Sequence, residues 1–251
     1  MSALAQYLNL QMFFPVGLFL VGLLVGLSVS AVVVRLPYVV ERQWLLDASE
    51  TLGIARNPDG PGQLGLAWRP DHFSLRVGLT MLAMGLLAGW AGLHYGVGPA
   101  ALAAVVLVAG LLALSLIDLE HQLLPDVLVL PLLWLGLIVN SVELFTSLTS
   151  AVWGAVGGYL VLWLLRGVSK LFSDTEGMGQ GDLKLLAMLG AWGGWQILPG
   201  VLLMSTLAAT VAFGVVMVSG KIDRKSPQPF GPCLAGAGWL ALMYTPDWTA
   251  I

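Results

Sequence analysis

The sequence predicts an all-α, polytopic membrane protein with about eight transmembrane helices and both chain termini on the non-cytoplasmic side. Its composition is the first reason: 58% of the 251 residues are hydrophobic and only 10% are charged, which is more apolar surface than a soluble domain of this length can bury. The other two reasons are a series of long runs without charged residues and the placement of the basic residues between those runs.

Eight candidate spans follow from the uncharged runs, because a helix needs roughly 20 mainly apolar residues to cross a hydrocarbon core of about 30 Å. The run 185–220 is long enough to cross twice, and the stretch GAWGGWQILPG at its centre supplies glycines, a proline and interfacial tryptophans for a turn. The eighth candidate lies between residues 230 and 244 and is short, as is the fourth. The first five lie within residues 1–34, 77–93, 99–117, 127–142 and 144–165.

The basic residues support this count independently, because cytoplasmic connections concentrate Lys and Arg. The connections GLHYGVGP, NSVELFTSLTS and GAWGGWQILPG contain none, and neither terminus does. The eight-span arrangement therefore places every basic residue on the cytoplasmic side. These eleven residues are Arg35, Arg42, Arg56, Arg69, Arg76, Arg166, Lys170, Lys184, Lys221, Arg224 and Lys225.

The same patterns predict three regions: a first span at 1–37, a cytoplasmic loop at 38–74 and a membrane-embedded domain at 75–251. Membrane lipids are the expected surroundings. A nucleic-acid partner is not expected, because the net charge is only −3 and the basic residues are scattered. Cys233 is the only cysteine, which excludes an internal disulfide and a four-cysteine zinc site.

Two acids stand at the cytoplasmic ends of predicted spans. Asp118 ends the third span and Asp182 begins the sixth, so both lie at about the same membrane depth although 64 positions (182 − 118) separate them. Ionisable groups at membrane depth are costly and are therefore often functional. Two carboxyl groups that share a proton can activate a water molecule and protonate a leaving amine, as in aspartic proteases.

Three interpretations of these acids stay open at this point. They are catalytic, they cap helices or lie solvated in loops, or they relay protons or bind a cation in a transporter or channel. The glycines Gly179 and Gly181, which flank Gln180 just before Asp182, favour catalysis because they allow a substrate strand to approach closely. Helix-end charges further predict that Asp182, at a helix N-terminus, is the ionised acid and Asp118 the protonated one.

Several long motifs resemble those of the prepilin peptidase family, the type IV leader peptidases, which are GxGD membrane aspartic proteases. They are GMGQGDLKLLAMLGAWGGW, LSLIDLEHQLLPDVLVLPLLWLGLIVN, PFGPCLAGAGW and, more loosely, VGLSVSAVVVRLPYVVERQW. The resemblance implies that Asp182 and Asp118 are the catalytic pair. Asp126, in the LPD element, is the rival of Asp118, and its alternative role is to cap the fourth span. Lys184 either pairs with a carboxylate or extends to the membrane interface.

The resemblance also implies substrates, a location and a second activity. The substrates are prepilins or pseudopilins of type IV pili or type II secretion, whose basic leader is cleaved at the cytoplasmic face of the bacterial inner membrane; proteolysis itself requires no cofactor. Many members also methylate the new N-terminus with S-adenosylmethionine and carry two CxxC pairs for zinc in the first cytoplasmic loop. This sequence has no cysteine within 38–74, so zinc is not expected and methylation stays open, as does a catalytically silent role in pilus or secretion assembly.

Overall fold

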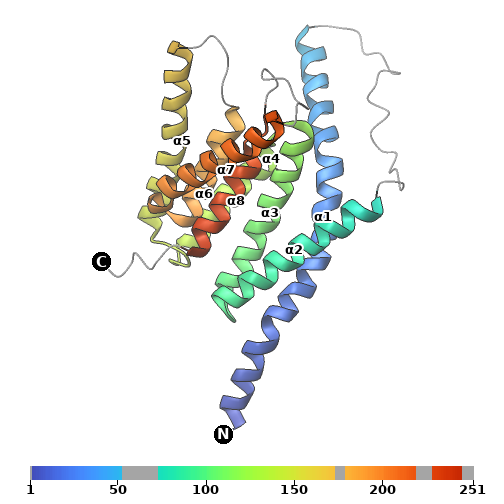
Figure 1. Cartoon of the computed structure of the whole chain (residues 1–251), viewed down its shortest axis with the longest axis vertical. Helices are drawn as coiled ribbons and strands as arrows, with labels where there is room; N and C mark the ends of the chain where they lie inside the picture. The colour runs from blue at the N-terminus through green and yellow to red at the C-terminus, as the bar shows by residue number, and fades with distance from the viewer. Residues whose placement is uncertain (1, 53–72, 173–178, 219–227, 245–251) are drawn as a thin grey trace.

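The computed structural model describes residues 2–52, 73–172, 179–218 and 228–244, and throughout these ranges helices alternate with short connections (Figure 1). The helices follow one another in the predicted order, and a one-turn 3-10 helix, η3, lies between the sixth and the seventh. They are α1 (Ser2–Leu52), α2 (Phe73–Tyr95), α3 (Pro99–His121), α4 (Asp126–Asn140), α5 (Leu148–Phe172), α6 (Gln180–Gly193), η3 (Trp195–Ile197), α7 (Leu198–Val218) and α8 (Gly231–Tyr244).

The predicted polytopic membrane architecture is confirmed. Within the described residues, five helical segments are long and apolar enough to cross a membrane, in α1, α2, α3, α5 and the η3–α7 unit. The remaining helices α4, α6 and α8 contain 15, 14 and 14 residues, which is below the roughly 20 residues that a perpendicular crossing needs. The sidedness of the termini stays a prediction, and the last residues, 245–251, lie outside the described ranges.

Helix α1 differs most from the expected boundaries. It is 51 residues long, or about 77 Å at 1.5 Å per residue, and so exceeds the thickness of a hydrocarbon core more than twofold. The helix continues through residues 38–52, where neither glycine nor proline interrupts it, so the first part of the expected cytoplasmic loop is helical. Residues 53–72 of that loop lie outside the described ranges, and the boundary at residue 37 stays a prediction.

Close helix packing holds the part of the chain that carries Asp182. A Cβ atom added to Gly190 of α6 would collide with the backbone of Gly154 in α5, and a Cβ added to Gly154 would collide with that of Gly190. Small residues at such positions let membrane helices approach until their backbones touch. Helix α6 is thereby fixed against α5, and on its other sides it packs against α4 and α8.

The turn between α6 and α7 forms where the sequence predicts it, but one of its tryptophans is not interfacial. The side chain of Trp192 is fully buried, and its indole N–H donates to the Leu132 carbonyl at 2.8 Å. Asn140, also fully buried, donates to the carbonyl oxygens of Ala191 and Trp192 at 2.9 Å and so satisfies the C-terminal end of α6. Both contacts tie α6 to α4, because hydrocarbon surroundings leave unpaired polar groups no alternative partner.

Candidate active site

The residues singled out from the sequence gather at one end of the helix bundle. The C-terminal ends of α1 and α3 and the N-terminal ends of α4, α6 and α8 all lie at the upper end of the molecule in Figure 1. Their residues line a pocket of about 550 Å³, within the range of roughly 300–1,000 Å³ that small-ligand sites occupy. All six predicted site residues line it: Asp118, Asp126, Gly179, Gly181, Asp182 and Lys184.

Asp118 lies in the last turn of α3 with only 6% of its surface exposed. Its Oδ2 accepts a hydrogen bond of 2.9 Å from the backbone N–H of Gly231, the first residue of α8. That N–H is one of the unpaired donors at a helix N-terminus, and the positive end of the helix dipole points the same way. Both features stabilise the ionised form of Asp118 and offset part of the cost of burying its charge.

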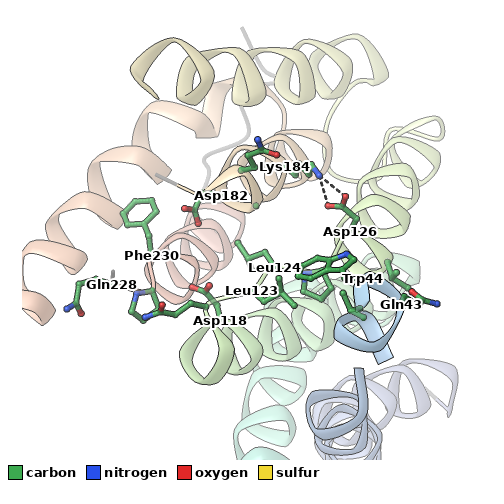
Figure 2. Close-up of a pocket in the computed structure, with 18 residues that line it drawn as sticks. Gln43, Trp44, Asp118, Leu123, Leu124, Asp126, Asp182, Lys184, Gln228 and Phe230 are labelled. Atoms are coloured by element: carbon green, nitrogen blue, oxygen red, sulfur yellow. Dashed lines mark hydrogen bonds and ion pairs between the residues drawn. The ribbon is translucent and has the colours of Figure 1, made fainter. Parts of the chain in front are cut away.

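Asp182 lies in the first turn of α6, outside the candidate spans, with 7% of its surface exposed. Burial is the main cause that raises its pKa, and the nearby negative charge of Asp118 adds to the effect. A hydrogen bond with the Gly179 backbone opposes both, and the resulting pKa is about 6. The two carboxyl groups therefore interact electrostatically, and Figure 2 shows them on facing sides of the pocket.

This environment favours the opposite protonation from the one expected from the ends of their own helices. The prediction considered only the C-terminus of α3 and the N-terminus of α6. The structure adds the N-terminus of α8, whose Gly231 N–H reaches Asp118 from 113 positions away in the sequence. The negative charge of Asp118 in turn disfavours ionisation of Asp182, which supports the opposite placement of the shared proton.

Asp126 has different surroundings from Asp118. It is the first residue of α4, and both of its carboxylate oxygens lie 2.7 Å from the Lys184 Nζ (Figure 2). Half of its side chain is exposed, and the N-cap position of α4 is occupied by Pro125, not by Asp126. Lys184 thus pairs with a carboxylate, one of its two predicted roles. An exposed Asp126 that is paired with a cation is less suited than the buried Asp118 to exchange a proton with Asp182.

The two glycines of the GxGD motif stand in different environments. A Cβ at position 181 would lie 2.6 Å from the Leu124 Cβ, so Gly181 lets the start of α6 touch the connection between α3 and α4. A Cβ at position 179 would lie 3.4 Å from the Asp182 Oδ2 and 4.0 Å from the Gly181 N, both ordinary contact distances. Gly179 has an extended backbone, φ −65° and ψ 149°, and that backbone also hydrogen-bonds with Asp182.

Some residues in the pocket or beside it were not identified from the sequence. Gly231 and Gln122 lie within motifs noted there, PFGP and IDLEHQLLPD, but hydropathy gave no reason to single them out. Trp44, on the C-terminal half of α1, lines the pocket with 57% of its surface exposed. It lies in a segment that the sequence assigned to a loop, so only a helix prediction through residue 52 would have placed it beside the acids.

The structure bears on the expectation that zinc is absent only where it describes the chain. Within the ranges that the structure describes, no group of three or more His, Cys, Asp or Glu side chains is arranged to hold a metal ion. The expectation that zinc is absent rests on the cysteine count and stays a prediction.

Comparisons with known proteins agree on one family. Residues 105–214, which include both acids, match the model of the type IV leader peptidase family. A protein from Stutzerimonas stutzeri named prepilin leader peptidase/N-methyltransferase is 45% identical, with 91% of this chain and 90% of the relative aligned. Proteins of the same name from Pseudomonas aeruginosa and Aeromonas hydrophila are 45% and 39% identical, covering 90% of this chain and 88% and 89% of their own lengths. No solved structure matches the chain significantly.

Proposed function

This chain belongs to the type IV leader peptidase family, and from that premise we propose that it is an aspartic endopeptidase that removes the basic leader of prepilins or pseudopilins. The observation that carries the proposal is the pair of buried, electrostatically interacting acids Asp118 and Asp182 in a pocket at the end of the helix bundle. Family membership also counts against the transporter or channel interpretation, since the relatives are named as peptidases.

The surroundings of the two acids support a specific division of labour. Ionised Asp118 takes a proton from a water molecule as the water oxygen bonds to the scissile carbonyl carbon. Protonated Asp182 gives its proton to the peptide nitrogen as the C–N bond breaks, which releases the leader and a new amine. A proton passes from Asp118 to Asp182 to restore the pair, and because the pair shares one proton, its two apparent pKa values belong to both residues.

The charges around the pocket support a cytoplasmic location for the cleavage. Arg76 pairs with Glu120, two residues after Asp118, at 2.7 Å, and Lys184 pairs with Asp126. These basic residues therefore lie at the same end of the bundle as the acids. Since basic residues concentrate on the cytoplasmic side, we assign the pocket to the cytoplasmic face of the bacterial inner membrane, where a short basic leader remains.

The proposal is tested with detergent-solubilised protein and a purified prepilin that carries a basic leader. We expect a shortened product whose new N-terminus begins where the leader ends, identified by mass spectrometry. An intact substrate after prolonged incubation with correctly folded wild-type protein would contradict the proposed activity and favour a catalytically silent role in assembly.

The glycines of the motif provide a further prediction for this activity. The Gly181→Ala substitution would lower the free energy of unfolding by about 1–3 kcal/mol, because the added methyl group collides with the Leu124 Cβ. Gly179→Ala meets no such obstacle, so we expect stability within about 0.5 kcal/mol of wild type but cleavage reduced about tenfold, since the methyl group stands where the substrate strand approaches. Thermal unfolding and cleavage rates of both variants check this, and wild-type cleavage by Gly179→Ala would contradict the approach role.

We extend the proposal to N-methylation of the new N-terminus, because the relatives are named for that activity as well. The pocket fits S-adenosylmethionine in charge and surface: the acids would hold its sulfonium cation, and the exposed Trp44 ring would hold its adenine. When bound, this cofactor supplies the methyl group to the amine that cleavage releases. The two acids would then hold both the new amine and the methyl donor in one pocket.

Binding and transfer are measured separately with methyl-labelled S-adenosylmethionine. We expect label on the mature pilin but not on the uncleaved prepilin, and about tenfold weaker binding of the cofactor to the Trp44→Ala variant, since base–aromatic stacking contributes roughly 1–3 kcal/mol. Unchanged binding by Trp44→Ala would place the cofactor elsewhere, and an unlabelled mature pilin would limit the protein to proteolysis.

A further inference from the structure

Gln122 has a backbone conformation that calls for an explanation. Among the described residues, only Gln122 and Glu143 are non-glycine residues with positive φ, at 52° and 53°. This left-handed conformation is unfavourable for residues that carry a Cβ, and at the C-terminal end of a helix it is usually adopted by glycine or asparagine. Gln122 stands at this position at the end of α3, where its N–H donates to the Asp118 carbonyl at 2.9 Å.

The position of Gln122 gives a reason to keep a side chain there. Gln122 lines the pocket four residues after Asp118, and its turn directs Leu123 and Leu124 along the pocket wall (Figure 2). Glycine would form the same turn without strain but would leave no side chain in the pocket. Strained backbone that persists beside reactive groups points to a functional constraint on the side chain.

Four glutamine side chains line the pocket. Gln43 of α1, Gln122 at the end of α3, Gln180 at the start of α6 and Gln228 ahead of α8 all line it, so the four come from four separate segments. An amide side chain offers both a donor and an acceptor, which matches the alternating N–H and C=O groups of an extended peptide. It carries no charge that would perturb the proton shared by the two acids.

We propose that Gln122 binds the main chain of the substrate peptide beside the scissile bond, through its side-chain amide. The inference rests on the proposed peptidase function and adds how the substrate is held. Because main-chain groups are common to all peptides, this contact can bind substrates of different sequence. It contributes equally to the binding free energy of the substrate and of the transition state. Gln122 is thus a substrate-binding residue, and removing its side chain raises KM with little change in kcat.

The test compares the Gln122→Gly and Glu143→Gly variants. Both relieve the same backbone strain, but Glu143 follows α4, whose other end carries Asp126, and it does not line the pocket. For Gln122→Gly we expect a thermal midpoint no lower than that of wild type, a KM raised between about two- and tenfold and a kcat within about twofold, as for one lost hydrogen bond. For Glu143→Gly we expect wild-type KM and kcat.

A second pair of variants keeps the test decisive where glycine disturbs folding. Gln122→Asn retains the amide and tolerates positive φ, whereas Gln122→Met has similar length but no amide. We expect Asn to recover part of the lost affinity and Met to recover none. A wild-type KM for either the Gly or the Met variant would overturn the role of Gln122. Failure of the wild-type protein to cleave any prepilin would instead refute the peptidase function itself.

Discussion

The Asp118→Asn and Asp182→Asn variants are each expected to cleave prepilin at least about a thousandfold more slowly than wild type while remaining folded. Asparagine has the shape of aspartate but cannot exchange a proton, and a positioned acid or base contributes roughly 10²–10⁴ to a rate. The fold tolerates the change because the amide oxygen of an asparagine at position 118 can still accept the Gly231 N–H. Single-turnover cleavage followed by mass spectrometry measures the effect.

Asp126→Asn is the matched control for these two variants. Asp126 lines the same pocket, but its exposed side chain pairs with Lys184, so we expect cleavage within about tenfold of wild type. If Asp126→Asn lost as much cleavage activity as Asp182→Asn while Asp118→Asn stayed active, Asp126 and not Asp118 would be the second catalytic acid. If Asp182→Asn cleaved prepilin nearly as fast as wild type, the aspartic protease mechanism would be refuted.

The Gly231→Ala substitution is expected to reduce cleavage about a hundredfold although Gly231 transfers no proton. The added Cβ would lie 2.7 Å from the Asp118 Oδ2 and 3.0 Å from its Cγ, so the carboxylate must move and its 2.9 Å hydrogen bond is lost. Displacement of a reacting group by about 1 Å costs rates of this order. Steady-state cleavage should show the loss in kcat, because the position of Asp118 and not substrate binding is disturbed.

Gly236→Ala provides the control within the same helix. No atom lies within 4 Å of a Cβ added at position 236, so the methyl group fits and should slightly stabilise α8. We expect wild-type cleavage by this variant. If Gly236→Ala and Gly231→Ala lose activity equally, general disturbance of α8 and not the contact with Asp118 would be the cause.

Much of the helical organisation could be predicted because membrane crossing imposes a strong pattern on composition. The turn between α6 and α7 falls within GAWGGWQILPG, and Asp118 and Asp182 fall at the ends of α3 and α6 as expected. Both results depend on the length of the uncharged runs and on the rule that successive connections lie on opposite sides of the membrane. Both can be read from the local sequence.

The contacts around the acids could not be predicted in the same way. The hydrogen bond from Gly231 to Asp118 and the ion pair of Lys184 with Asp126 join segments 113 and 58 positions apart, and hydropathy does not specify which helices face each other. The extension of α1 to Leu52 was missed because its charged residues resemble those of a loop. The contact with Gly231 bears on which acid is ionised, and only the folded chain shows it.

The most direct test of the dyad is the pKa of Asp182 in wild-type protein and in the Asp118→Asn variant. The carboxyl infrared band that disappears in Asp182→Asn can be followed between about pH 4 and pH 8. The wild-type value should lie near 6 and should fall when Asp118 loses its charge, because repulsion between the two carboxylates disfavours ionisation of Asp182. Burial should keep the variant's pKa above the ordinary value of about 3.9. The same pKa in both proteins would show that the two acids do not interact and would contradict a shared active site.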